Sequence, residues 1–315
     1  MPSRSPSLRP AAAGSAVADG ALMASTPRRE EPTPLAAPTP PRTRSELGAR
    51  VLVAIPLLAF VIAIDLLGGD VFAAALLLLG GVCLYELYEL YDDINPARIA
   101  GFIALAGLIA AAQFGTRDQL LLVAVAAIPL TFLLTIITPR GAAATGSGTR
   151  TGTFALALTL LGIWWIGLAL GHAVLLRRLP HGGGIVIDVV IGTFVGDSAA
   201  YLGGRAFGRH PLAPAISPKK TVEGLIAGIG TAVGAVWVAS LFQPWLHTGD
   251  ALALGAGVAL AAPLGDLFES FIKRDAGAKD TGHLFGAHGG ALDRLDAVMF
   301  AAVAGYYIWH AILLK

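Results

Sequence analysis

The stretch SFIKRDAGAKDTGHLFGAHGGALDRLD, residues 270–296, lies between two apolar segments and carries basic and acidic side chains at close spacing. The flanking segments, near residues 251–272 and 297–314, approach the length of about 20 apolar residues that a bilayer core requires. Across the whole chain, 55% of the 315 residues are hydrophobic and only 14% are charged. Opposite charges concentrated beside membrane spans point to multivalent ions or phosphates as ligands.

The composition predicts an all-α polytopic membrane protein, with helices around a cytoplasm-facing polar cavity. The mean hydropathy is +0.71. Nothing in the chain resembles a basic, aromatic-interleaved surface for nucleic acid, and the lone Cys83 excludes a disulfide within the chain. About nine spans are expected, at roughly 50–67, 71–91, 99–115, 119–138, 153–175, 184–203, 222–242, 251–272 and 297–314.

Residues 1–47 are rich in Pro, Ala, Ser and Thr, and we expect them to form a disordered cytoplasmic tail before a transmembrane domain at 48–315. With the tail inside, most Lys and Arg beyond it fall in loops on the same side, including 204–221 and 273–296. Only the pair Arg177-Arg178 fits this orientation poorly. We therefore expect a multi-pass protein of the inner cell membrane, with its N-terminus and active site cytoplasmic.

The first polar segment, 196–224, places Asp197 inside a predicted span, where a carboxylate normally faces a partner or a polar cavity. Tyr201 lies one turn on and could orient it. Further along, Ser217-Pro-Lys-Lys-Thr221 precedes a predicted helix, with Pro218 as a turn residue and Ser217 and Thr221 as candidate caps. Lys219 and Lys220 then suit an anion, although a membrane anchor explains them equally well.

The second polar segment, 263–274, has Asp266, Glu269 and Lys273 on one helical face, with Ser270 one turn from Asp266. Glu269 and Lys273 have the favourable order for an i, i+4 ion pair. This pair leaves Asp266 without a cation.

The third polar segment, from Asp275 to Asp296, separates its acids by glycines. Asp293 and Asp296 are three residues apart and can present two carboxylates to one ion, for which Mg²⁺ is the natural candidate. His288 could donate to a phosphate or simply be a loop residue. Interleaved acids and bases suit a metal-bridged polyphosphate, with carboxylates on the metal and Lys or Arg on the remaining oxygens.

At these residues the chain resembles the phosphatidate cytidylyltransferases (CDP-diacylglycerol synthases). The resemblance covers about residues 48–315, with Ala291 and Gly286-Ala287 as departures from the usual pattern. It implies that CTP and phosphatidic acid react to give CDP-diacylglycerol and pyrophosphate. The matching positions near the C-terminus are Ser270, Ile272, Lys273-Arg274, Lys279-Asp280, His288-Gly289-Gly290, Asp293-Arg294, Leu295 and Asp296.

The resemblance also implies roles for individual residues. Metal ligation, by Mg²⁺ alone or with a second cation, is expected at Asp266, Asp293, Asp296 and Asp197. Catalytic roles are expected for Asp266, Asp280, Lys273, Lys279 and Arg294, and substrate binding for Ser217, Lys219, Lys220, Arg274, His288 and Tyr201. The bilayer is the expected environment, and a homodimer stays open.

Two alternatives of different kinds remain. Another CTP-dependent lipid enzyme, such as an isoprenoid kinase or an ether-lipid cytidylyltransferase, would need the same mixture of charges. A transporter with Asp197 and Asp266 on a cation or proton path is the second alternative. The charge density of 273–296 exceeds what transport requires, and no inverted repeat is evident in the sequence.

Overall fold

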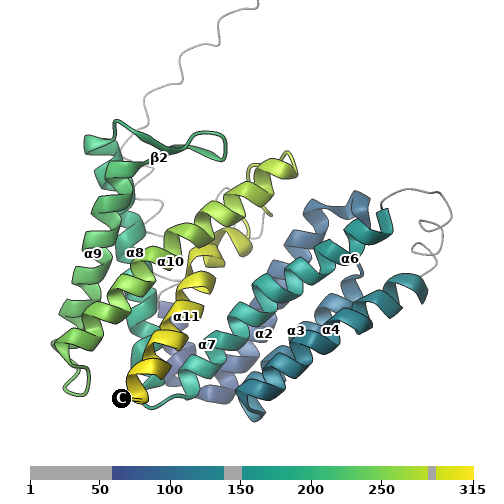
Figure 1. Cartoon of the computed structure of the whole chain (residues 1–315), viewed down its shortest axis with the longest axis horizontal. Coiled ribbons are helices and arrows are strands. Elements are labelled where there is room, and N and C mark those ends of the chain that lie inside the picture. Colours follow the sequence, from purple (N-terminus) through teal and green to yellow (C-terminus); the bar gives the residue numbers. More distant parts are fainter. Residues whose placement is uncertain (1–58, 138–150, 283–288) are drawn as a thin grey trace, which may run out of the picture. The chain divides into compact units, whose positions relative to one another are not determined.

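The structure is a computed structural model that describes residues 59–137, 151–282 and 289–315. Two units are distinguished, residues 1–47 and 48–315, and every described residue belongs to the second. Figure 1 shows that this unit is built from helices and one short hairpin. In chain order the elements are α2 (Gly69–Leu90), η1 (Asp92–Ile94), α3 (Arg98–Phe114), α4 (Arg117–Ile137), α6 (Thr151–Gly162), η2 (Ile163–Gly167), α7 (Leu168–Arg178), α8 (Gly182–Phe207), β1 (Pro211–Ala213), β2 (Ser217–Thr221), α9 (Val222–Ser240), α10 (Thr248–Asp275) and α11 (Leu292–Leu313).

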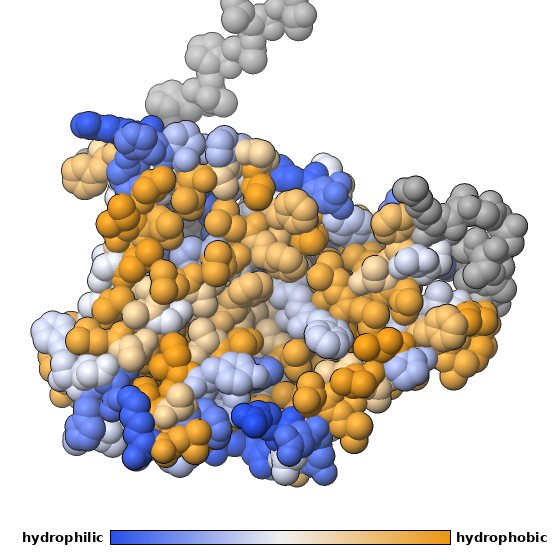
Figure 2. All heavy atoms as spheres, viewed as in Figure 1, coloured by the Kyte–Doolittle hydropathy of each residue, from blue (hydrophilic) through white to orange (hydrophobic). Residues whose placement is uncertain are grey.

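Seven helices of the described residues are long and apolar enough to cross a membrane, with α6, η2 and α7 together counting as one. Helix α3 is shorter and also apolar. Apolar side chains extend across the middle of the face in Figure 2, and hydrophilic ones gather toward its upper and lower ends. The prediction of an all-α polytopic membrane protein is confirmed. Half of the first predicted span, 50–67, lies outside the described residues.

Helices α8 and α9 pack closely because small residues face each other along both. A Cβ atom on Gly228 would lie 2.9 Å from the carbonyl oxygen of Gly196, so the two backbones nearly touch there. Such contact suits a bilayer, where apolar surface alone gives little drive for helices to associate. The close packing fixes the end of α8 and the start of α9, between which the hairpin lies.

The hairpin was not predicted. Strand β2 pairs with β1 in antiparallel fashion, with Ala213 opposite Ser217 and Pro211 opposite Thr221. Thr221 is the cap of α9, as expected, and its hydroxyl accepts a hydrogen bond from the Gly224 N–H at 3.1 Å. The expected cap at Ser217 and turn at Pro218 are wrong, because both residues lie within β2. Proline is tolerated there since a two-stranded hairpin consists of edge strands.

Arg177 and Arg178, the pair that fitted the predicted orientation poorly, both have structural partners. The Nε atom of Arg177 lies 2.6 Å from Asp65 Oδ1. Arg178 donates to the carbonyl oxygen of Gly115 at 2.9 Å, just after the end of α3, where helix carbonyls lack partners. These two arginines therefore join separate segments of the chain, and contacts within the protein satisfy both.

Candidate active site

One face of α10 carries the acidic and basic side chains that the sequence placed together. Glu269 and Lys273 form the predicted i, i+4 ion pair, with Oε2 2.5 Å from Nζ. Ser270 Oγ lies 3.5 Å from Asp266 Oδ1, at the far limit of a hydrogen bond. Lys273 Nζ also reaches Asp293 Oδ1 at 2.7 Å. This face of α10 is therefore turned toward α11.

The backbones of α10 and α11 meet at Gly265. A Cβ atom at this position would lie 2.4 Å from the carbonyl oxygen of Asp296 and 3.1 Å from the Cα of Ala297. Only a residue without a side chain fits against that backbone without displacing it. The close approach brings Asp266 and Glu269, which follow Gly265 on α10, next to Asp296 on α11.

Three carboxylates form a compact group, the acidic trio of Asp266, Glu269 and Asp296. One carboxylate oxygen from each lies within 4.8 Å of the others. Glu269 is 1% exposed, and among the described residues no hydrogen-bond partner reaches its Oε1 atom. A buried carboxylate oxygen without a partner is costly unless a cation or donor satisfies it. The trio therefore fits a hard divalent cation, for which oxygen ligands are preferred.

A lysine from the hairpin and an acid from α8 lie beside the acidic trio and interact with its charges. The Nζ atom of Lys220 lies 2.6 Å from Asp266 Oδ2, which supplies the cation that Asp266 lacked in the sequence pattern. Asp197, exposed on α8, interacts electrostatically with both Asp266 and Lys220. Asp296 interacts with Asp197 as well. Segments 196–224 and 263–296 therefore converge on one site.

Asp293 has a different environment from Asp296, although the two are three residues apart. Its carboxylate accepts hydrogen bonds from Lys273 Nζ at 2.7 Å and from the backbone N–H groups of Thr281 and Gly290 at 2.9 and 2.8 Å. The Thr281 hydroxyl donates to it as well, at 2.9 Å. The structure thus engages Asp293 with the loop between α10 and α11. Asp293 also contacts Glu269, but it is not one of the three carboxylates whose oxygens lie within 4.8 Å of one another.

The other predicted site residues lie around this centre. Arg274 donates to the Ile216 carbonyl at 3.3 Å and so links the end of α10 to the hairpin. Tyr201 is half-buried one turn beyond Asp197 on α8. His288 lies outside the described residues. Lys219, Lys279 and Asp280 are exposed, whereas Ser217 and Arg294 are half-buried.

Sequence reasoning missed three residues that shape the site. Glu269 was taken only as the partner of Lys273, yet it belongs to the acidic trio. Gly265 gave no signal beyond being a glycine in a helix. Glu86 accepts hydrogen bonds from two backbone N–H groups at the start of α11. It did give a signal, because it is a carboxylate within the apolar span 71–91, the same signal that singled out Asp197.

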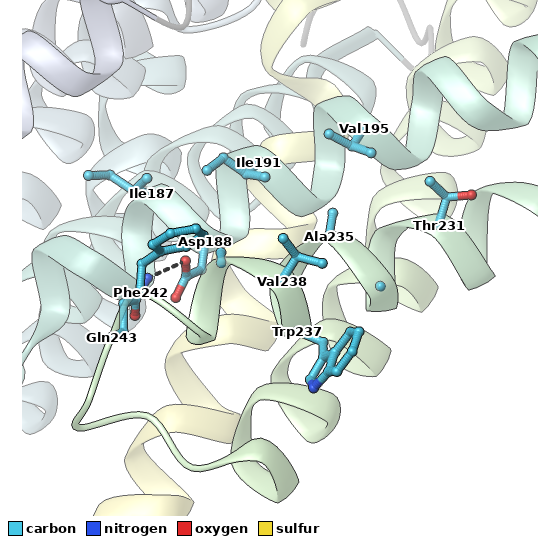
Figure 3. Close-up of a pocket in the computed structure, with 12 residues that line it drawn as sticks. Ile187, Asp188, Ile191, Val195, Thr231, Ala235, Trp237, Val238, Phe242 and Gln243 are labelled. Atoms are coloured by element: carbon cyan, nitrogen blue, oxygen red, sulfur yellow. Dashed lines mark hydrogen bonds between the residues drawn. The ribbon is translucent and has the colours of Figure 1, made fainter.

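A cavity of about 690 Å³ lies elsewhere, between α8 and α9. Figure 3 shows it lined mainly by apolar side chains, with Asp188 and Gln243 near one end. The amide of Gln243 donates to Asp188 Oδ1 at 2.8 Å. No predicted site residue is among those that line it. This apolar cavity is therefore separate from the charged centre, where the chemistry is expected.

Comparison with known proteins gives a consistent assignment. The model of the cytidylyltransferase family matches residues 48–312. Phosphatidate cytidylyltransferase 4, chloroplastic, of Arabidopsis thaliana is 32% identical over 290 residues, which are 83% of this chain and 73% of that protein.

Bacterial relatives match over shorter regions. The phosphatidate cytidylyltransferase of Aquifex aeolicus (strain VF5) is 44% identical over 122 residues, 39% of this chain and 46% of that protein. The phosphatidate cytidylyltransferase of Mycobacterium bovis (strain ATCC BAA-935 / AF2122/97) is 36% identical over 148 residues, 46% of this chain and 47% of that protein. The chain thus spans about half the length of these bacterial relatives.

Proposed function

Because the chain belongs to the cytidylyltransferase family, we propose that it transfers the cytidylyl group of CTP to phosphatidate. The products are CDP-diacylglycerol and pyrophosphate, and the role is phospholipid biosynthesis. The observation that carries this proposal is the acidic trio of Asp266, Glu269 and Asp296 with Lys220 and Lys273 against it. Neighbouring acidic and basic side chains suit a nucleoside triphosphate and its metal ion. The carboxylates can bind the metal ion, and the lysines can bind phosphate oxygens.

The reaction joins two anions. An oxygen of the phosphatidate phosphate attacks the α-phosphorus of CTP, and the bond from that phosphorus to the oxygen bridging to the β-phosphate breaks. Pyrophosphate leaves with the electron pair. A phosphate monoester is largely dianionic near neutral pH, since its second pKa is about 6. Little general-base catalysis is therefore needed, and the main work is positioning and charge neutralisation.

In this proposal Asp266, Glu269 and Asp296 hold a divalent cation, Mg²⁺, and Asp197 lies near enough to support a second cation. When bound, the metal neutralises phosphate oxygens and favours the approach of the two anions. Asp293 acts by holding Lys273 beside Glu269 rather than by ligation.

The basic residues neutralise the phosphates of both substrates in the same proposal. Lys220 and Lys273 contact acids of the site and would therefore lie closest to the reacting phosphates. A more peripheral set of basic residues beside Asp280 would neutralise the triphosphate and the lipid phosphate: Lys219, Arg274, Lys279 and Arg294. Ser217, Tyr201 and His288 would be further substrate contacts.

Sidedness follows from the basic loops. The hairpin and the loop between α10 and α11 lie at the same end of the unit 48–315, the upper end in Figure 1. Most of the Lys and Arg among the described residues lie in or beside these two loops, so in this proposal the loops face the cytoplasmic side of the inner membrane, where CTP is available. Residues 1–47 are likewise expected to be a cytoplasmic tail. Residues 48–315 form the catalytic domain in this proposal, and a homodimer stays an expectation.

The proposal is tested with purified protein in detergent, CTP, phosphatidate and Mg²⁺. We expect CDP-diacylglycerol and pyrophosphate to appear in equal amounts. Chelation of divalent ions should remove the activity, and added Mg²⁺ should restore it, because the acidic trio alone repels the substrates. Formation of neither product from any lipid acceptor would overturn the proposal.

The same assay separates the rivals. Replacing phosphatidate by diacylglycerol or dolichol should abolish the reaction; a phosphorylated lipid with CDP as co-product would identify a kinase instead. An ether-linked phosphatidate, offered in place of the ester-linked lipid, tests whether the protein is an ether-lipid cytidylyltransferase. Activity in detergent itself argues against a transporter, because transport needs a sealed compartment and chemistry does not.

We expect His288→Ala to lower turnover by no more than about tenfold. The phosphatidate nucleophile already lacks its proton, so the reaction gives a histidine base little to do, whereas general acid–base groups typically contribute 10²–10⁴-fold. The rate is measured at saturating CTP across pH 6–9. A loss as large as that of a metal-ligand variant would show that proton transfer limits the reaction.

A further inference from the structure

Glu86 on α2 holds the start of α11, which lies more than 200 residues later in the chain. It is 5% exposed. Its two carboxylate oxygens accept hydrogen bonds from the backbone N–H groups of Ala291 at 2.9 Å and Leu292 at 2.8 Å. The first N–H groups of a helix have no partner within the helix, and the helix dipole favours a negative charge there. A carboxylate from another helix thus caps α11.

Two glycines give this carboxylate its space. A Cβ atom on Gly290 would lie 2.4 Å from Glu86 Oε2 and 2.5 Å from Oε1. One on Gly282 would lie 2.7 Å from Oε1. Any side chain at either position would displace Glu86 or the loop. Both ends of the segment 282–290 are therefore shaped around one carboxylate.

A chain of polar contacts runs from Glu86 to the acidic trio. The Thr281 hydroxyl lies 3.4 Å from Glu86 Oε2 and 2.9 Å from Asp293 Oδ2. Asp293 Oδ1 lies 2.7 Å from Lys273 Nζ, which is in turn 2.5 Å from Glu269 Oε2. A displacement of the α11 start would therefore move Asp293, and with it the lysine that sets the position of Glu269.

Tyr91, at the end of the same helix, holds the other side of the loop. Its hydroxyl lies 3.0 Å from the Ile272 carbonyl and 2.9 Å from Asp275 Oδ2, both in the last turn of α10. Burial and the Asp275 carboxylate raise the pKa of Tyr91, so the hydroxyl keeps its proton and remains a donor. Helix α2 therefore contacts the end of α10 and the start of α11 together.

We propose that Glu86 is a positioning residue for the reaction, one that fixes the start of α11 and thereby the geometry of Asp293, Lys273 and the acidic trio. This role rests on the proposed function, because it concerns the same site. It assigns to α2, a helix outside both polar segments 196–224 and 263–296, a direct part in building the centre.

The first test replaces Glu86 by glutamine, with Glu89→Gln as the matched control. Glu89 lies one turn away on α2 and is 46% exposed at the surface, where it pairs with Arg98. An amide cannot accept from two N–H groups through both of its ends, since one end is itself a donor. We expect backbone N–H exchange at Ala291 and Leu292, measured by hydrogen–deuterium exchange, to become about tenfold faster in Glu86→Gln only.

Activity provides the second readout. Glu86→Gln should lower kcat by about tenfold and raise the Mg²⁺ concentration for half-maximal rate, because outer residues that orient ligands typically affect metal affinity or activity by 10–100-fold. The KM for CTP should change little. A loss of stability alone would reduce the amount of active protein and leave the Mg²⁺ dependence unchanged.

A double-mutant cycle tests the contact from its other side. Its first arm keeps Glu86 in place and therefore serves if variants of Glu86 fold poorly. Gly290→Ala should lower kcat by about tenfold in the wild-type background, because the methyl group meets the Glu86 carboxylate. In a Glu86→Ala background the same methyl fits the vacated space and should cost nothing further.

Unchanged exchange at Ala291 and Leu292 in Glu86→Gln, or additive losses in the cycle, would overturn the positioning role. If the wild-type protein makes no CDP-lipid, the proposed function fails, and the exchange measurement still decides whether Glu86 holds α11.

Discussion

Replacing Asp266 by asparagine will lower turnover by about a thousandfold or more while leaving the protein inserted in the membrane. Asp266 is the member of the acidic trio that also contacts Lys220, so in the proposed mechanism its charge would serve both the cation and the substrate side of the site. A bound metal supplies several kcal/mol of charge stabilisation in the transition state, and each 1.36 kcal/mol is a factor of ten in rate. Initial rates of CDP-lipid formation at saturating Mg²⁺ measure the effect.

Asp250→Asn is the control, because Asp250 lies at the opposite end of the same helix and contacts Lys315 at 3.7 Å. It should retain nearly full activity. Lys220→Gln separates the two roles of Asp266: if Asp266 serves only to hold Lys220, both variants lose the same activity with unchanged Mg²⁺ dependence. Turnover like that of the wild type in Asp266→Asn would exclude a metal-ligand role.

Local spacing predicted the parts of this site that depend on one helix. The pair Glu269–Lys273 was expected from the i, i+4 order, and it is present. The run of apolar segments likewise predicted the helices, because a bilayer demands both length and hydrophobicity. These features need no knowledge of which helices are neighbours, and for that reason the sequence alone was sufficient.

Contacts between distant segments could not be predicted in this way. The ion pair of Lys220 with Asp266 depends on how the hairpin folds back over α10, and the short strand pairing that directs it carries no strong pattern. Equally, Asp293 and Asp296 look equivalent by spacing. Their environments differ because the loop between α10 and α11 turns its N–H groups toward Asp293.

The resemblance to a family identified the charged positions but not the task of each. A signature of acids and bases includes residues that would bind ligands and other residues that would hold the binding residues in place. Asp296 belongs to the acidic trio, whereas Asp293 has its oxygens occupied by Lys273, Thr281 and Gly290. Glu86 lies outside the signature altogether and still contacts its backbone. These differences in contact depend on packing between distant segments, and the proposed division of roles rests on them.

Gly265→Ala should lower kcat by about a hundredfold and destabilise the protein by about 1–3 kcal/mol, as overpacked cores typically do. The new methyl group would meet only backbone atoms: the carbonyl oxygen and carbon of Asp296 at 2.4 and 3.0 Å, and the Cα of Ala297 at 3.1 Å. Backbone of a helix cannot rotate away, so α10 and α11 must separate. A misplacement of about 1 Å at a reacting centre is enough for a loss of this size.

Gly257→Ala is a matched control on the same helix, facing the same partner. Its Cβ would meet the end of the Ile308 side chain, with Cδ1 at 2.0 Å, and a rotamer change relieves that contact. Thermal unfolding in detergent and the Mg²⁺ dependence of the rate are compared for both variants. If Gly265→Ala keeps the activity of Gly257→Ala, the separation of α10 from α11 does not govern the acidic trio. If instead Gly265→Ala alone loses activity and needs more Mg²⁺ for its half-maximal rate, the close approach that Gly265 allows is what keeps the three carboxylates at ligand distance.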